Sequence, residues 1–266
     1  MVKLGVVEFL NSRPLIERLS QRPDVQCLFD VPARLPARLE SGEVDAALIP
    51  VFDVIKSMGR LRVVSDACIA SDGETMTVRV FSQVPPDRLR SLAVDVDSHT
   101  SVALVRVLWR ELYGRELELH AAELRGAASS GFESVLLIGD KVVDPARGRF
   151  AYEIDLGGAW RQLTGLPFVF AVWAAPSAPP DRHELAEVLS TARDRGVARA
   201  AEIAADDGPK LGWPVELARR YLTRCLCFTL DERAIAGADL FADYCRKLEL
   251  VPADAAIHWP AAVTAA

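Results

Sequence analysis

Short apolar runs alternate with amphipathic patterns along the first half of the chain. The runs have the length and β-branched content of buried strands, and they lie at residues 3–9, 44–51, 78–82, 91–95 and 134–138. Apolar side chains at helical spacing predict helices at 33–40 and 98–113. Pro14 predicts the first turn of a further helix, with Ser12 or Asn11 as its N-cap. This alternation predicts an α/β fold with a largely parallel sheet.

The second half of the chain begins with an apolar stretch at residues 163–174 that turn residues interrupt. This pattern predicts a strand that leaves one lobe and returns to another. From residue 181 to about 245 the pattern is helical, with breaks at 207–209 and near 227–229.

The proline pair at residues 85–86 indicates a linker between two predicted strands, because proline resists both helix and central strand. We therefore expect two lobes with a ligand cleft between them. Their bounds are 1–82 plus 172–266 for the first lobe, 87–168 for the second, and about 83–86 and 169–171 for the hinge segments.

Composition narrows the class of partner. The 266 residues carry a formal net charge of −6, so the chain lacks the basic footprint of a nucleic-acid-binding protein. Five cysteines, an odd number among apolar neighbours, fit reduced thiols in the cytoplasm. The N-terminal run is interrupted at Glu8, Asn11 and Arg13, and no apolar stretch reaches the roughly 20 residues of a membrane span. A cytoplasmic protein without membrane contact is expected.

Polar residues recur where predicted strands end, which is the edge at which open α/β sheets bind ligands. These clusters are Asn11-Ser12, Ile49-Pro50, Ser71-Asp72-Gly73, Asp97 to Ser101, and Gly139-Asp140. Two of the clusters open predicted helices, where free N–H groups favour a carboxylate or a phosphate. For Ser12, Ser98 and Thr100 a simple helix cap is the alternative. Asp140 could act as a base, orient a ligand or cap a helix.

Aromatic residues near the expected cleft, Phe168 among them, are either its walls or ordinary core. The chain has no GxSxG, P-loop, GxGxxG or HExxH motif, so nucleotide-dependent and metal-dependent chemistry have no support.

Five segments carry a resemblance to a known family. They are VEFLNSRPL at 7–15, LESGEVDAALIP at 39–50, DVDSHTSV at 95–102, LLIGD at 136–140 and TGLPFVFAVW at 164–173. In this order they resemble the chorismate dehydratases of the futalosine route to menaquinone, and the resemblance runs from about residue 4 to about 244.

The resemblance implies a two-lobed fold similar to type II periplasmic binding proteins, working as a cytosolic enzyme. Its members remove water from chorismate and give 3-[(1-carboxyvinyl)oxy]benzoate, with no cofactor and no metal. Asn11 and Ser71 or Thr77 are then expected near the leaving hydroxyl or a carboxylate, and Ser98, Thr100 and Ser101 at the other carboxylate. The remaining expected substrate contacts are Ser12, Ile49, Pro50, Gly139, Asp140 and Phe168. The proton acceptor is hypothesised to be the enolpyruvyl carboxylate of the substrate itself.

Two alternatives remain. The 1,4-dihydroxy-6-naphthoate synthase of the same pathway is similar, but that family has a catalytic histidine where this chain has Gly139. It also has a lysine and a serine near Leu48-Ile49-Pro50, and both differences favour the dehydratase. Thr77 stands where a serine is more usual in the dehydratases. The second alternative is a non-catalytic cytosolic protein that binds a small carboxylate, and a homodimer is left open in either case.

Overall fold

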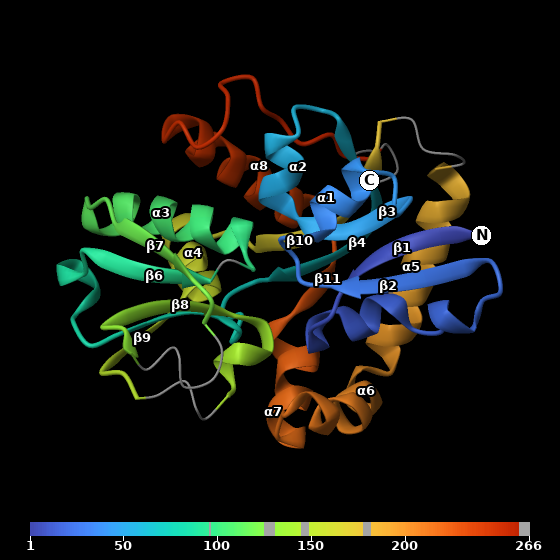
Figure 1. Ribbon diagram of the computed structural model, residues 1–266, viewed down its shortest axis with the longest axis horizontal. Helices are drawn as coiled ribbons and strands as arrows, with labels where there is room; N and C mark the ends of the chain where they lie inside the picture. The colour runs from blue at the N-terminus through green and yellow to red at the C-terminus, as the bar shows by residue number, and fades with distance from the viewer. Residues whose placement is uncertain (96, 125–130, 145–148, 178–181, 261–266) are drawn as a thin grey trace.

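The computed structural model describes residues 1–95, 97–124, 131–144, 149–177 and 182–260. Two β-sheets lie side by side in separate halves of the molecule, and helices flank both (Figure 1). The N-terminal strands and most of the C-terminal helices belong to the half that holds the first sheet, and the central part of the sequence forms the other half.

The first sheet has six strands in the order β11-β4-β10-β3-β1-β2. They are β1 (Val2–Val7), β2 (Val25–Asp30), β3 (Ala46–Pro50), β4 (Leu61–Ser71), β10 (Phe168–Pro176) and β11 (Cys227–Thr229). Strand β1 is parallel to β2 and β3, but β10 runs antiparallel to β3 and β4. Strand β11 is also antiparallel to β4, so the sheet is mixed and the prediction of a largely parallel sheet is wrong. Strand β4 leads out of this half and β10 leads back into it, so the two neighbours point in opposite directions.

The second sheet has five strands in the order β7-β6-β8-β5-β9. They are β5 (Val78–Ser82), β6 (Ser91–Asp95), β7 (Glu118–Ala122), β8 (Ser134–Ile138) and β9 (Tyr152–Asp155). The predictions at 78–82, 91–95 and 134–138 are confirmed to the residue. However, β5 was expected in the first lobe, and it pairs instead with β8 and β9. The chain first crosses between the sheets at residues 72–77, ahead of the proline pair.

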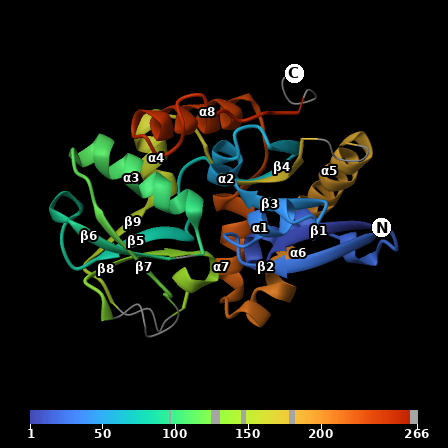
Figure 2. The same cartoon turned by 45° about the horizontal axis from the view of Figure 1, so that its top comes forward.

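Helices fill the spaces between the strands and around both sheets. The α-helices of the described residues are α1 (Leu35–Glu40), α2 (Val51–Lys56), α3 (His99–Tyr113), α4 (Leu156–Thr164), α5 (Arg182–Ala198), α6 (Ala200–Asp207), α7 (Val215–Arg220) and α8 (Glu232–Lys247). Helix α8 packs against α2 and β10 of one half and α3 of the other (Figure 2). Within the described residues, no helix combines the length and the apolar character that a bilayer crossing requires.

Local sequence signals account for both ends of α3. Helix α3 begins where Ser98 Oγ accepts the N–H of Ser101, and it ends at Gly114 with φ +62°. The helix predicted around Pro14 is a 3₁₀ helix, η1 (Leu10–Ile16). Its N-cap is Phe9, so the prediction that Ser12 or Asn11 caps it is wrong, and both residues lie inside it.

The two segments that connect the sheets are in contact with each other. The first is residues 72–77, and the second is α4 with residues 165–167. The Asp155 carboxylate accepts the N–H groups of Thr75 (2.9 Å) and Met76 (2.8 Å) in the first crossing and that of Gly158 (3.0 Å) in the second. A Cβ at Gly157 would lie 2.5 Å from the Gly73 carbonyl oxygen, so the close approach requires glycine.

Candidate active site

A cavity lies between the two sheets, and residues of both halves line it. Its volume is about 60 Å³. The polar lining residues are Asn11, Thr75, Thr77, Ser98, Thr100, Ser101 and Tyr221, and the others are Val7, Phe9, Pro32, Pro50, Ile69, Val78, Ile138, Gly139, Phe170 and Ala171. Since neither half supplies the full set, the site exists only where the halves meet.

None of the described residues that line this cavity carries a charge at neutral pH. An anionic ligand must therefore be held by hydroxyl groups, an amide and the N-terminus of α3, where unpaired N–H groups give a positive potential. This agrees with the acidic character of the whole chain, which gives no general attraction for anions.

Asn11, Thr77 and Tyr221 form one polar cluster in the cavity. The Tyr221 hydroxyl lies 2.7 Å from Thr77 Oγ1, and the Asn11 side chain also hydrogen-bonds it. Asn11 Oδ1 is buried without a hydrogen-bond partner within the described part of the chain. A buried acceptor left unpaired costs about 1–3 kcal/mol, so a donor on a ligand would be stabilising there.

Tyr221 is held rigidly although it lies far from the other lining residues in sequence. It is the first residue of a π-helical turn, η8 (Tyr221–Cys225), and such turns are frequent at functional sites. Its ring stacks on Trp213 with centroids 4.9 Å apart and planes 11° apart. Burial raises the pKa of the Tyr221 hydroxyl, and hydrogen bonds with Thr77 and Asn11 oppose that rise. The phenol is therefore protonated at neutral pH.

Ser98, Thr100 and Ser101 form a second polar cluster at the start of α3. Ser98 Oγ donates to Ser101 Oγ at 2.7 Å, which leaves the Ser101 proton available to a further acceptor. The Thr100 hydroxyl accepts from Phe52 N (3.2 Å) and donates to the Phe170 carbonyl (3.3 Å). Thr100 therefore joins α3 to the opposite half, while Ser101 is the free donor of this cluster.

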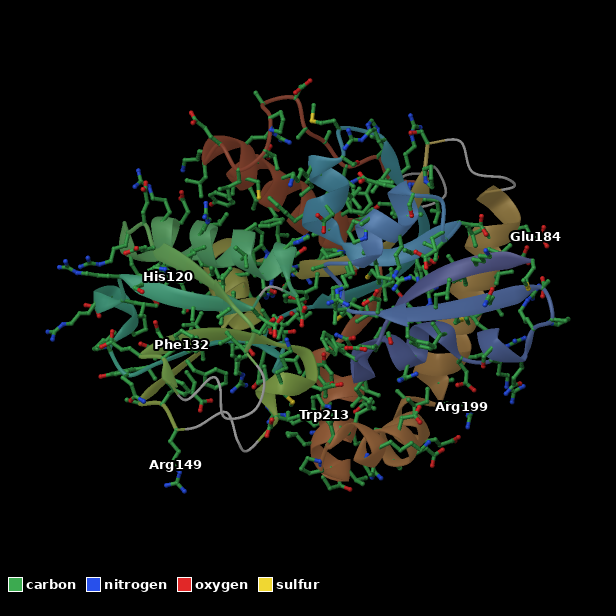
Figure 3. The ribbon with its side chains drawn as sticks, viewed as in Figure 1. His120, Phe132, Arg149, Glu184, Arg199 and Trp213 are labelled. Carbon is green, nitrogen blue, oxygen red and sulfur yellow. The ribbon has the colours of Figure 1, made fainter. Side chains whose placement is uncertain are left out.

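Asp140 joins the halves at another edge and does not line the cavity. Its Oδ1 accepts the Trp213 indole N–H at 2.9 Å and the Leu10 N–H at 3.3 Å. Figure 3 shows Trp213 near the boundary between the two halves. Burial raises the pKa of Asp140 to about 6, although the bond from Trp213 opposes this. Because both donors lie in the opposite half and Asp140 is not in the lining, the geometry shows a contact between the halves, and a role of Asp140 toward a ligand remains a prediction.

The raised pKa of Asp140 predicts a pH-dependent stability. Its ordinary value is 3.8, so between about pH 4 and 6 the folded protein keeps a proton that the unfolded chain releases. Stability should therefore fall as the pH rises through this range. Asp140→Asn keeps an acceptor for both donors and should remove about 1–2 kcal/mol of this fall between pH 5 and 7.5, measured by urea unfolding. If the free energy of unfolding fell equally with pH in the variant and in the wild type, Asp140 would not be the group responsible.

Several residues expected to contact substrate lie outside the cavity lining. Ser12 is fully buried, and its hydroxyl donates to the Val7 and Phe9 carbonyls. Ser71 is fully buried, and its hydroxyl donates to the Gly73 carbonyl at 3.2 Å. Both hydroxyls satisfy local backbone groups instead of facing a ligand.

Ile49 and Phe168 also lie in the core rather than in the lining. The Phe168 ring packs edge-on against Trp160 (5.3 Å) and Phe241 (5.0 Å). The structure does bring together Asn11, Pro50, Thr77, Ser98, Thr100, Ser101 and Gly139 around one cavity. Their contacts with substrate remain predictions.

The sequence did not indicate Tyr221 and Phe9 as lining residues, whereas Phe170 was one of the aromatic residues considered as a cleft wall or as core. Tyr221 comes from a helical stretch that carries no local signal of a site. Phe170 lies two residues beyond Phe168 in β10, so both side chains are on the same face of the strand. Their ring centroids are 4.7 Å apart, but only Phe170 lines the cavity. Phe9 packs on Gly139, where φ is +59° and an added Cβ would come within 2.6 Å of its ring.

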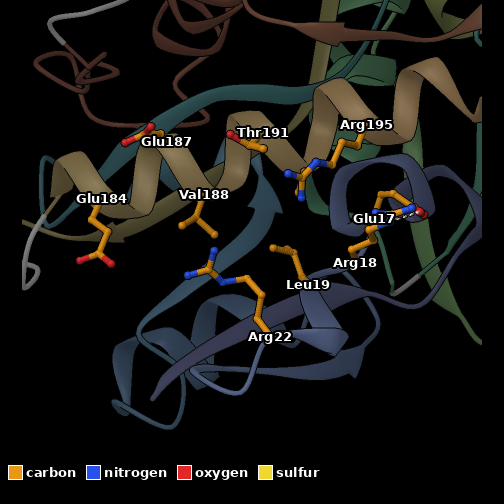
Figure 4. A pocket seen from close by; sticks show the side chains of 10 residues that line it. Glu17, Arg18, Leu19, Arg22, Glu184, Glu187, Val188, Thr191 and Arg195 are labelled. Atoms are coloured by element: carbon orange, nitrogen blue, oxygen red, sulfur yellow. Dashed lines mark ion pairs between the residues drawn. The ribbon is translucent and has the colours of Figure 1, made fainter.

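A second hollow lies between α5 and the N-terminal segment, away from all the predicted site residues (Figure 4). It is lined by three arginines and three glutamates, namely Arg18, Arg22, Arg195, Glu17, Glu184 and Glu187. Because the two signs balance, this hollow has no preference for a charged ligand.

Two mixed sheets joined by two crossings, with a polar cavity between them, define the type II periplasmic-binding-protein-like class. Solved structures of this class superpose on most of the chain. A protein from Archaeoglobus fulgidus matches with a TM-score of 0.75 and 14% identity over 94% of this chain and 98% of its own. The periplasmic aliphatic sulphonate binding protein SsuA from Escherichia coli matches with a TM-score of 0.60 and 14% identity over 94% and 93%.

The sequence itself assigns the chain more narrowly. The profile of the menaquinone biosynthesis family matches residues 2–247, and the chain belongs to this family. The chorismate dehydratase of Thermus thermophilus is 31% identical over 257 residues, which cover 90% of this chain and 93% of that protein.

Proposed function

We propose that this protein is a chorismate dehydratase, a hydro-lyase that converts chorismate to 3-[(1-carboxyvinyl)oxy]benzoate and water in menaquinone biosynthesis. The observation that carries the proposal is the 31% identity to the Thermus thermophilus enzyme over nearly the whole of both chains. The cavity supports it, because an uncharged polar lining beside a helix N-terminus suits a hydroxylated dicarboxylate. Five free cysteines support a reducing, cytoplasmic location.

The two polar clusters divide the recognition of chorismate between them. The C4 hydroxyl of the substrate donates to the unpaired Asn11 Oδ1 and accepts from the Thr77–Tyr221 pair. A carboxylate accepts from Ser101 Oγ at the start of α3, where the helix dipole adds to the attraction. The ring lies between the apolar walls that Phe9 and Phe170 provide.

The elimination requires a group that accepts the C3 proton and a leaving C4 hydroxyl. The electrons of the C3–H bond form the new ring double bond, and the C4–O bond breaks with its electrons on oxygen. Loss of the proton and the hydroxyl makes the ring aromatic, so the driving force lies in the substrate. Since the described lining residues include no carboxylate and no imidazole, we assign the C3 proton to the enolpyruvyl carboxylate of chorismate.

The direct test mixes the purified protein with chorismate, without metal or nucleotide, and follows the products by liquid chromatography and mass spectrometry. We expect a compound lighter than chorismate by one water, formed in proportion to protein and identical to authentic 3-[(1-carboxyvinyl)oxy]benzoate. Formation of 4-hydroxybenzoate, which arises by loss of pyruvate, would not count. Chorismate that binds and survives would support a non-catalytic binder instead.

Asp140→Asn tests the substrate-assisted step. We expect turnover within about threefold of wild type at pH 7.5, because the amide oxygen still accepts from Leu10 and Trp213. Steady-state rates and the dissociation constant of the benzoate product measure the two effects separately. Loss of turnover with intact product binding would assign the base to Asp140 instead.

Gly139 argues against the alternative that the protein is a 1,4-dihydroxy-6-naphthoate synthase. A side chain there would collide with the Phe9 ring, and φ is positive. The catalytic histidine of that family therefore has no place in this site without movement of Phe9.

A further inference from the structure

Tyr221 lies in the cavity in an arrangement that the binding of substrate alone does not require. Its side chain is 1% exposed, and its hydroxyl contacts the Asn11 side chain of the first half and the Thr77 side chain at the end of the first crossing. Stacking on Trp213 fixes the ring, and Trp213 is itself fixed by its bond to Asp140. The Tyr221 hydroxyl therefore lies beside the position that we propose for the leaving hydroxyl of the substrate.

The cluster has one hydroxyl proton to spare. Asn11 donates through its amide, because its Oδ1 has no partner within the described part of the chain. Thr77 and Tyr221 share a single contact of 2.7 Å, which uses one of their two protons. The remaining proton and Asn11 Oδ1 together make one donor and one acceptor, the complement of an alcohol group.

Tyr221 is the acidic member of this cluster. A phenol has an ordinary pKa of about 10 and is a much stronger acid than water. The hydrogen bonds from Thr77 and Asn11 both stabilise the phenolate, so the anion would have two partners as soon as it forms. Burial keeps the proton in place until an oxygen that is more basic than phenolate appears beside it.

On the basis of the function proposed above, we propose that Tyr221 is a catalytic residue that gives its hydroxyl proton to the C4 oxygen as that oxygen departs. The C4–O bond breaks with its electron pair on oxygen, and this oxygen takes the Tyr221 proton and leaves as water. The enolpyruvyl carboxylate accepts the C3 proton and then returns one proton to the tyrosinate. The net change is chorismate to the substituted benzoate and one water, with Tyr221 restored.

Tyr221→Phe removes only this hydroxyl and keeps the ring that stacks on Trp213. We expect kcat for chorismate to fall about 10²- to 10⁴-fold, the range for loss of a general acid. The product lacks the leaving hydroxyl, so its dissociation constant, measured by calorimetry, should change by less than about threefold. Tyr244→Phe is the matched control, because it removes a hydroxyl from a ring that packs on Trp160 outside the cavity, and its kcat should equal that of wild type.

The outcomes separate this proposal from the function on which it rests. If the wild-type protein does not dehydrate chorismate, the proposed function fails first. If wild type is active and Tyr221→Phe has an unchanged kcat, the role of Tyr221 is overturned while the function stands. If the variant loses product binding in parallel with kcat, Tyr221 shapes the site without giving a proton, and the proposal is likewise overturned.

Discussion

Asn11→Ala should lower kcat/KM for chorismate about 10²- to 10³-fold, as loss of a positioned hydrogen-bonding group in an active site does. The variant removes both the acceptor at Oδ1 and the amide that hydrogen-bonds Tyr221. Its stability should respond differently from its activity. Because Oδ1 is buried and unpaired, its removal relieves a cost, and we expect the free energy of unfolding to stay within about 1 kcal/mol of wild type. Steady-state kinetics and urea unfolding measure the two effects.

Gln83→Ala provides the control for Asn11→Ala. The Gln83 amide donates to the Arg149 carbonyl on the surface of the second half, so its removal should leave both quantities unchanged. An Asn11→Ala protein that is folded and within threefold of wild-type activity would show that the reaction takes place elsewhere.

Among alanine substitutions of the glycines in the described part of the chain, Gly196→Ala is expected to cause the largest loss of stability. A Cβ at Gly196 in α5 would lie 1.8 Å from the Pro14 carbonyl oxygen and 2.5 Å from its carbon. Neither atom can move without displacing η1, so we expect a loss of about 3 kcal/mol or more in urea unfolding. Activity should fall as well, because Asn11 lies in the same short helix as Pro14.

Gly131→Ala is the matched control for Gly196→Ala. A Cβ at Gly131 would meet no described atom within 4 Å, so the same methyl should leave stability within about 0.5 kcal/mol of wild type. Equal stability of the two variants would contradict the packing of α5 against η1.

The predicted strands that were confirmed are short, and each has at most one charged residue, as Arg79 in β5 and Asp95 in β6. Strand β4, which the sequence did not indicate, is longer, with 11 residues, and has two, Arg62 and Asp66, which interrupt its apolar pattern. Asp66 is paired with Arg193 of α5 at 2.9 Å. The partner that allows a charge on this strand is more than a hundred residues away, so no local pattern could indicate it.

Some residues of the site could likewise be predicted from the local sequence, and others depend on contacts between distant segments. Strand ends identified Asn11, Ser98 and Ser101 because the carboxyl ends of strands converge on one edge, whereas Thr77 was expected only from the family resemblance. The same rule also selected Ser12 and Ser71, whose hydroxyls are used by nearby carbonyls. Tyr221 reaches the cavity only through the packing of Trp213 and α7, which depends on the complete fold.

The shared contact at Asp155 has a mechanical consequence. One carboxylate accepts N–H groups from both crossings, so the two connections behave as one double-stranded ribbon rather than as two separate tethers. A ribbon bends easily in one direction only, and the halves are therefore expected to share a single axis of rotation. The bonds of Asp140 to Leu10 and of His99 to Asp53 lie outside this ribbon. Together with the bonds of Asp140 to Trp213 and of Thr100 to Phe52 and Phe170, they are contacts between the halves that such a rotation would break as a ligand enters.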